Sequence, residues 1–118
     1  MNARIVFAAA LLMPWTAHAQ DAGEKAYAEG RYAEAAVHFE QALAKAGEKT
    51  KPQILLALGS CYLQTKNLEG AVKVLREAVA LKAETADVHR SIAGALGMLG
   101  RLDEAIAGLR LAEALDPG

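Results

Sequence analysis

The residues that could do covalent chemistry are few, and their spacing does not bring them together. Cys61 is the single cysteine, so no disulfide can form within the chain, and it lies in an apolar run beside Tyr62. A reactive thiol needs cationic neighbours and exposure, so a small buried core residue is the favoured interpretation. The sequence has no Cys-x-x-Cys pair, no glycine-rich phosphate loop and no Gly-x-Ser-x-Gly elbow.

Histidines and carboxylates do not form a site either. His38 has no His, Cys or carboxylate at a metal-ligand spacing on its helical face, and the chain has no His-x-x-x-His pair. For His89 we favour packing in the core over a functional role. Adjacent carboxylates such as Asp103 and Glu104 point in different directions around a helix, so they cannot share one substrate. The sequence therefore predicts no catalytic residue, no metal site and no cofactor.

Composition limits the class of protein further. A chain of 118 residues forms one small domain at most. With 53% hydrophobic and 5% aromatic residues, mostly Ala and Leu, it suits packed helices better than a sheet core. The net charge is −1, with both signs interspersed and no Lys/Arg cluster, which argues against nucleic-acid binding.

Residues 1–19 read as a secretory signal peptide. Arg4 provides a positive start, residues 5–13 are apolar, and Ala17-His18-Ala19 is a small-x-small cleavage site. We expect cleavage between Ala19 and Gln20. The residue directly after that site is Gln20 and not a cysteine, which excludes lipid anchoring there, and no other stretch approaches a membrane span. The alternative is an uncleaved amphipathic anchor.

Three segments share one residue pattern, and their positions divide the rest of the chain into repeats. The segments are residues 30–36, 66–72 and 100–106, and their alanines Ala35, Ala71 and Ala105 are 36 and then 34 residues apart. Phe39, Leu75 and Leu109 keep these offsets and are expected on the inward stripe of their helices. A fixed period of this size with helical patterning predicts a helix–turn–helix array.

The middle copy resembles the tetratricopeptide repeat (TPR) family. Leu55, Leu58, Gly59 and Tyr62 hold the spacing of the Trp-x2-Leu-Gly-x2-Tyr pattern, with Leu in place of Trp, and Pro117 supplies the closing proline of the last copy. The resemblance implies an all-α, right-handed α-solenoid of three TPR helix–turn–helix repeats, an α-α superhelix. The TPR domain would span 20–118, with repeats at about 20–50, 51–84 and 85–118. Similarity to exported bacterial TPR proteins implies a periplasmic location.

Helix boundaries follow from breakers and caps. In the first repeat we expect helices at about residues 21–29 and 32–45, separated by Gly30. Pro52 suits the first turn of the next helix, where its missing N–H costs nothing. Lys66-Asn67 replaces the usual glycine at the following turn, where Asn tolerates a left-handed backbone and Lys does not.

The first helices of the repeats should line a concave groove, the usual binding surface of solenoids. We expect the groove to bind an extended peptide or an apolar helix. Gly94 and Gly97 would form a notch for a partner, although loose packing in a terminal repeat is the alternative. The predicted groove residues are Glu24, Tyr27, Leu56, Ser60, Leu63, Gln64, Arg90, Gly94, Gly97 and Met98.

Co-chaperone TPR domains hold a C-terminal carboxylate with a Lys/Asn/Arg clamp on this groove. The resemblance places Gln20, Glu24, Ala57, Asp87 and Ser91 at the clamp positions. No cation is among them, so a carboxylate-terminated chaperone tail is not the expected ligand.

The last helix carries a second apolar stripe, made of Ala107, Leu111 and Ala114. A terminal repeat normally ends in a polar outer face. The stripe therefore predicts either a second interface, possible in a homo-oligomer, or a chain that continues beyond Gly118.

The sequence as a whole predicts a non-catalytic protein–protein interaction module, a periplasmic adaptor or scaffold that binds a protein or peptide partner. No nucleic acid and no membrane span after signal cleavage are expected. Two alternatives remain open. One is a regulatory or presenting module of a larger secreted enzyme or export machine, and the other is a self-assembling structural unit.

Overall fold

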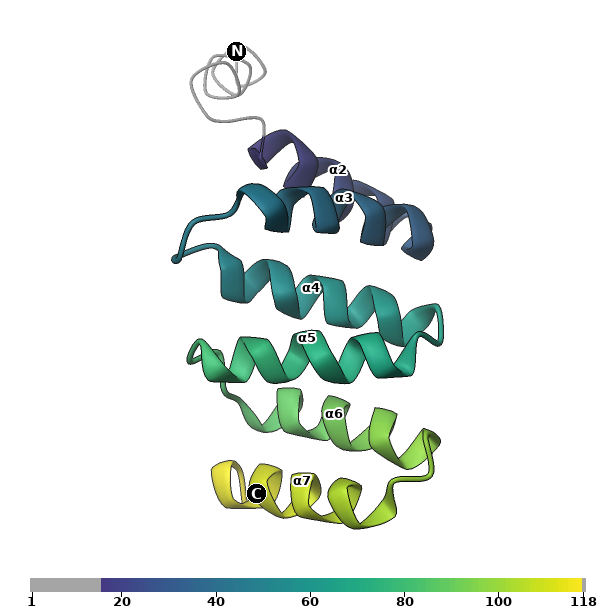
Figure 1. The fold of residues 1–118 in the computed structure, drawn as a ribbon, viewed down its shortest axis with the longest axis vertical. Coiled ribbons are helices and arrows are strands. Elements are labelled where there is room, and N and C mark those ends of the chain that lie inside the picture. The colour runs from purple at the N-terminus through teal and green to yellow at the C-terminus, as the bar shows by residue number, and fades with distance from the viewer. Residues whose placement is uncertain (1–15, 118) are drawn as a thin grey trace.

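The computed structural model describes residues 16–117, and these residues form helices and no strand. Most of the predicted signal peptide, residues 1–15, lies outside them. The helices stack in chain order along a body with extents of 51 × 25 × 25 Å (Figure 1). The prediction of an all-α solenoid is confirmed. The helices are α2 (Thr16–Ala28), α3 (Tyr32–Lys45), α4 (Lys51–Gln64), α5 (Leu68–Ala80), α6 (Ala86–Met98) and α7 (Leu102–Leu115).

Consecutive helices pack as three hairpins, α2–α3, α4–α5 and α6–α7, and the hairpins join through α3–α4 and α5–α6. Each helix therefore contacts mainly its neighbours in sequence, which is the nearest-neighbour arrangement of a repeat protein. None of the described helices is long and apolar enough to cross a membrane.

The turn inside each hairpin has the same backbone closure. The second residue after the first helix is left-handed, with φ of 80° at Gly30, 66° at Lys66 and 81° at Gly100. The amide of the next residue donates to the carbonyl oxygen five residues back, at 2.9, 2.8 and 2.9 Å respectively. This is the Schellman motif, which satisfies carbonyl groups that a helix end leaves free.

The middle turn has no glycine, and the structure shows which of its two residues replaces it. Lys66, and not Asn67, takes the left-handed conformation, while Asn67 has a φ of −83°. The side-chain oxygen of Asn67 accepts a hydrogen bond from the amide of Gly70 at 3.2 Å. Asn67 is therefore the N-cap of α5, and the position that needs positive φ falls on the lysine before it.

Helix α2 also begins earlier than expected. It starts at Thr16 rather than near Asp21, so residues 17–19 at the predicted cleavage site are helical. No glycine or proline interrupts the alanine-rich stretch between Thr16 and Gly23, so nothing in it opposes the extra turn. Helix α3 has the predicted bounds, Tyr32–Lys45.

The core depends on glycines that allow close helix approach. A Cβ on Gly59 would lie 2.5 Å from Cδ2 of Leu75, and one on Gly23 would lie 2.9 Å from the ring of Phe39. In each of the first two repeats, a glycine on the first helix thus leaves room for a large side chain from the second helix of the same repeat.

The third repeat reverses this arrangement. Ala93 replaces the glycine on α6, and Gly108 on α7 is the residue that approaches it, with 3.3 Å between a Cβ built on Gly108 and that of Ala93. The expectation that Leu109 packs inward like Phe39 and Leu75 is wrong. Leu109 is 51% exposed, against 2% and 3% for its counterparts, because no described helix follows α7 to cover it.

Candidate functional site

A cavity of about 280 Å³ lies between the first helices of the first two repeats, α2 and α4. Phe39 of α3 is 2% exposed and forms its floor. Gly23 brings α2 close enough to hold that ring from one side. The lining residues are Glu24, Tyr27, Phe39, Ala57 and Ser60.

The cavity combines aromatic walls with a polar rim. The ring of Tyr27 packs edge-on against Tyr32, with 5.0 Å between ring centroids, which fixes its orientation beside the floor. Glu24 adds a carboxylate at the exposed edge and Ser60 a hydroxyl. Such a site suits a partner's apolar side chain flanked by a hydrogen-bond donor or a cation.

The structure brings only part of the predicted groove together. Glu24, Tyr27 and Ser60 line the cavity. Leu56 is half-buried and packs against both core clusters, so it joins the repeats rather than facing an open groove. Leu63 is half-buried as well and packs on the second cluster.

Sequence reasoning missed two lining residues, Phe39 and Ala57. Phe39 was predicted to be an inward core residue, and its ring both fills the core and floors the cavity. Ala57 is at a clamp position of the TPR resemblance, so that alignment was the signal that could have found it.

The rest of the predicted groove, on α4 and α6, is open. Gln64 is exposed, and the Arg90 guanidinium lies 2.7 Å from a carboxylate oxygen of Asp87 and 3.7 Å from one of Asp116. A Cβ on Gly94 or Gly97 would meet no atom within 4 Å. Packing therefore does not require either glycine, and the notch stays a prediction.

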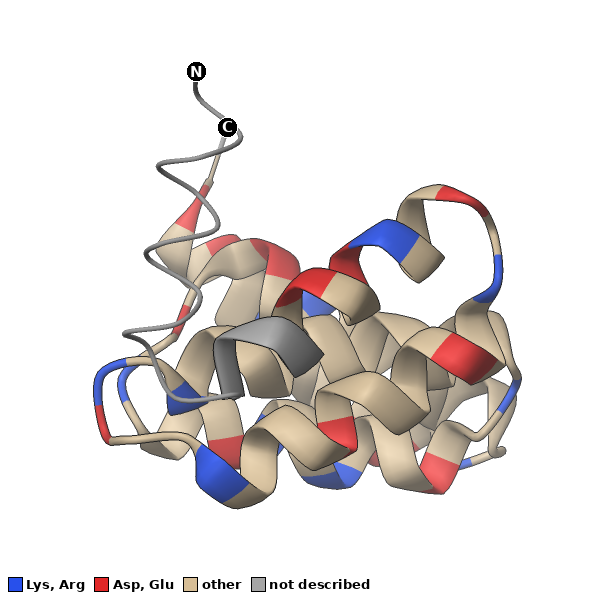
Figure 2. Cartoon of the chain, turned by 90° about the horizontal axis from the view of Figure 1, so that it is seen from above, with Lys and Arg blue, Asp and Glu red and all other residues tan. Residues whose placement is uncertain are grey.

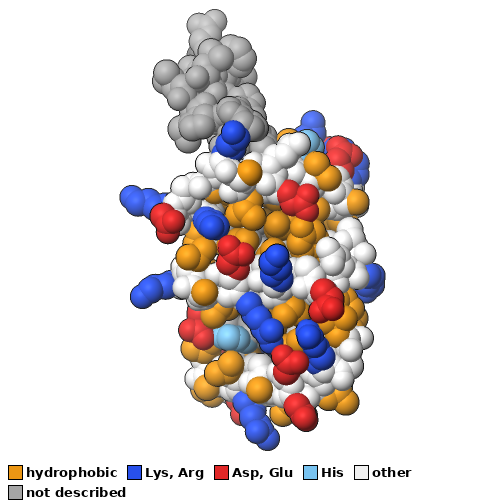
Figure 3. Space-filling model, viewed as in Figure 1, with side chains coloured by type: hydrophobic (Ala, Val, Ile, Leu, Met, Phe, Trp, Pro, Cys, Tyr) orange, Lys and Arg blue, Asp and Glu red, His pale blue; other side chains and the backbone are white. Residues whose placement is uncertain are grey.

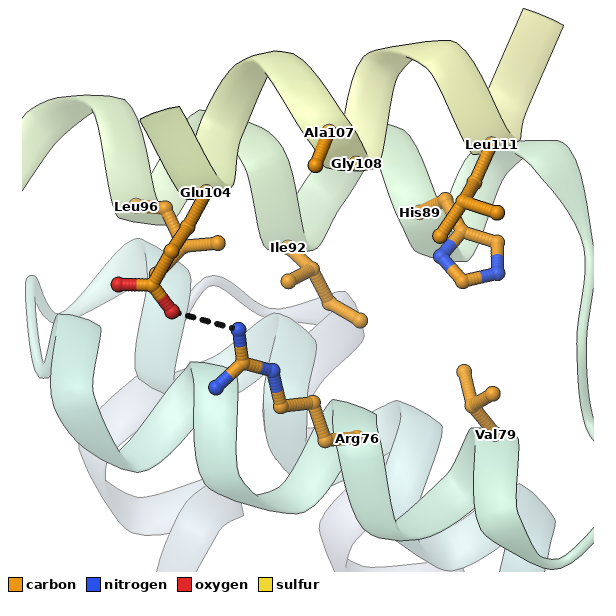
Figure 4. Close-up of a pocket in the computed structure, with 9 residues that line it drawn as sticks. All are labelled: Arg76, Val79, His89, Ile92, Leu96, Glu104, Ala107, Gly108 and Leu111. Carbon is orange, nitrogen blue, oxygen red and sulfur yellow. Dashed lines mark hydrogen bonds and ion pairs between the residues drawn. The ribbon is translucent and has the colours of Figure 1, made fainter. Parts of the chain in front are cut away.

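A second cavity of about 240 Å³ lies between α5, α6 and α7 (Figure 4). An ion pair between Arg76 and Glu104, 3.2 Å apart, borders it. The buried His89 reaches it from α6, with Nε2 2.8 Å from a carboxylate oxygen of Glu84. Its lining residues are Arg76, Val79, His89, Ile92, Leu96, Glu104, Ala107, Gly108 and Leu111.

Small residues in the third repeat account for this second cavity. Where the second repeat has Val74 and Tyr62, the third has Gly108 and Leu96. Tyr62 fills the equivalent space and donates a hydrogen bond from its hydroxyl to Glu40. Of the predicted second stripe, Ala107 and Leu111 line the cavity and Ala114 is exposed elsewhere.

The charged side chains of residues 16–117 are dispersed rather than gathered at one site. Acidic and basic residues are interspersed over the helices and loops (Figure 2). Burial raises the pKa of the Cys61 thiol to about 11, and burial together with the Glu40 contact raises the pKa of Tyr62 to about 12. No group of three or more His, Cys, Asp or Glu side chains in this part of the chain is placed to hold a metal ion.

Stacked helical hairpins with a lined cavity between first helices define a helical-repeat protein. A family model described as "Tetratricopeptide repeat" matches residues 26–93, and a second model of the same description matches residues 71–118. The chain belongs to the tetratricopeptide repeat family. No curated protein matches it.

Solved structures with the same fold include two domains of one protein and a third chain. The first TPR of Spaghetti (RPAP3) bound to the HSP90 peptide SRMEEVD has a TM-score of 0.76 and 21% identity, covering 87% of this chain and 80% of its own. The second TPR, bound to the same peptide, has a TM-score of 0.76 and 22% identity, covering 86% and 92%. MamA AMB-1 has a TM-score of 0.53 and 23% identity, covering 86% and 73%.

Proposed function

We propose that this protein is a non-catalytic adaptor or scaffold that binds an extended peptide or a helix on the face formed by α2, α4 and α6. The observation that carries the proposal is the cavity between α2 and α4, with its Phe39 floor and its Glu24 and Ser60 rim. It would hold one apolar anchor side chain of the partner. The exposed surface of α6 would hold the flanking residues.

The partner differs in charge from the peptide bound by the RPAP3 domains. That peptide, SRMEEVD, is acidic. Here Glu24 and Asp87 stand at clamp positions and are exposed, and both repel a carboxylate-rich segment. We therefore propose an apolar segment that carries a Lys, an Arg or a hydrogen-bond donor beside its anchor.

A matched pair of variants tests the site. Peptides selected for binding to the full chain would be measured by calorimetry against the wild type, Ser60→Arg and Gln41→Arg. Ser60→Arg places a long cation in the mouth of the cavity and should weaken binding at least about tenfold, or about 1.4 kcal/mol. Gln41→Arg makes the same charge change at an exposed position of α3 and should leave the affinity unchanged. Equal affinities of the two variants would reject the cavity as the binding site.

We also propose that the protein acts in the periplasm after removal of residues 1–19. N-terminal sequencing of the protein from the periplasmic fraction should begin at Gln20. Retention of Met1 in a protein confined to the cytoplasm would reject export without affecting the peptide site.

A further inference from the structure

Helix α7 exposes a row of large apolar residues that the other repeats keep covered. Leu102, Ile106 and Leu109 are 62%, 48% and 51% exposed. We call these three residues the end row. Hydrophobic side chains also reach the surface at the α7 end of the face shown in Figure 3.

The equivalent residues on α5 pack against the next helix, which indicates the kind of contact that the end row can make. Leu68, Val72 and Leu75 belong to a core cluster with Val88, Ile92 and Ala95 of the next helix, α6. The end row has the same spacing on α7, and no described helix packs on it. It is thus a helix-packing surface that no helix of residues 16–117 covers.

The opposite end of the solenoid does not complement this surface. Where α4 turns Ala57 and Cys61 toward the preceding helix, α2 has Asp21 and Lys25, and both are exposed. If Asp21 and Lys25 covered Leu109 or Ile106, their charges would be buried without partners, which is costly. Head-to-tail stacking of copies is therefore disfavoured, and a self-complementary contact between two α7 helices is favoured.

Two charges flank the end row in a pattern that fits such a contact. Asp103 and Arg110 are seven residues apart, close to two helical turns, so they lie on one side of α7 with Ile106 between them. Neither has an ion pair within residues 16–117. In an antiparallel pair of α7 helices centred near Ile106, Asp103 lies beside the partner's Arg110, and the reverse holds by symmetry.

We propose that the end row is the interface of a twofold symmetric homodimer, in which α7 packs antiparallel against α7 of a second copy. The two Ile106 side chains meet near the axis, with Leu102 and Leu109 on either side of it. Two Asp103–Arg110 pairs set the register. The cavity between α2 and α4 lies at the other end of the solenoid and takes no part in the contact, so this proposal does not depend on the peptide site.

Sedimentation velocity of the full chain, over about 1–100 µM, tests the interface. The wild type should reach a dimer and no larger species. Ile106→Glu should be monomeric. Val37→Glu, which changes an α3 residue of nearly equal exposure (50% against 48%), should dimerise like the wild type. Helical content and melting temperature would confirm that both variants fold.

Charge reversal tests the register separately. Asp103→Arg and Arg110→Asp should each weaken dimerisation at least about tenfold, because each places like charges opposite one another. The double variant should restore the wild-type affinity to within about threefold. A monomeric wild type, association that survives Ile106→Glu, a ladder of larger oligomers, or a double variant weaker than both single ones would each overturn the proposal.

Discussion

At the scale of single residues, the left-handed position of the hairpin turns is occupied by glycine in the first and third repeats and by lysine in the second. Gly30 and Gly100 adopt positive φ freely, whereas Lys66 adopts the same conformation with a side chain. A left-handed non-glycine residue costs roughly 1–2 kcal/mol, while glycine loses about 0.5–1 kcal/mol through the greater freedom of the unfolded chain. Lys66→Gly should therefore stabilise the fold by about 0.5–1 kcal/mol in urea denaturation. Lys66→Ala removes the same charge but keeps the strain, so a matching gain in that variant would contradict the explanation.

A second residue-scale prediction concerns alkaline pH. Burial raises the pKa of Cys61 from 9.0 to about 11, so the folded state favours the protonated thiol. This stability is fully present below the unfolded-state pKa near 9 and is lost as the pH rises toward 11, because the unfolded chain releases the proton first. The free energy of unfolding should fall across that window, and Cys61→Ala should flatten the fall. An unchanged slope in Cys61→Ala would assign the loss to other groups such as Tyr62.

At the scale of helices, a Gly→Ala substitution should lower the free energy of unfolding at one site and raise it at another. In Gly59→Ala the new Cβ would lie 2.5 Å from Cδ2 of Leu75, so the Leu75 side chain or its helix must shift, and overpacking of this kind costs about 1–3 kcal/mol. In Gly94→Ala the new Cβ meets nothing within 4 Å, and the helix gains about 1 kcal/mol in propensity. Thermal and urea unfolding of the two variants would measure both effects. Destabilisation by Gly94→Ala would mean that a neighbour packs against Gly94 in solution.

The element scale is also where the sequence was most informative. The breaker Gly30 and the inward positions Ala35 and Phe39 predicted α3 to the residue, because they mark the helix locally. The residue type alone did not decide which of Lys66 and Asn67 takes the left-handed conformation, because the cap formed by Asn67 depends on the amide of Gly70. Phe39 was predicted only as a core residue. Its ring also borders the cavity because of the gap between α2 and α4, which no spacing within one helix reveals.

At the scale of the whole molecule, the solenoid has two ends of different character and a binding face between them. The polar α2 end carries Asp21 and Lys25, and the α7 end carries the end row. Twofold pairing at α7 would leave one cavity at each far end of the dimer. Two linked sites raise the effective affinity for a partner that spans both of them, so such an assembly suits a scaffold better than a single solenoid does.

The acidic residues of the groove predict that this chain differs from the RPAP3 domains in the peptide that it binds. The peptide SRMEEVD should not bind, because Glu24 and Asp87 present carboxylates where an acidic tail would need cations. Raising the salt concentration would screen the repulsion without supplying the missing donors, so binding should stay absent at every ionic strength. Calorimetry with the second TPR of RPAP3 as the positive control would check this result, since that domain is seen with the peptide bound. Binding of comparable strength by this chain would show that other groups of the α2–α4–α6 face recognise the peptide.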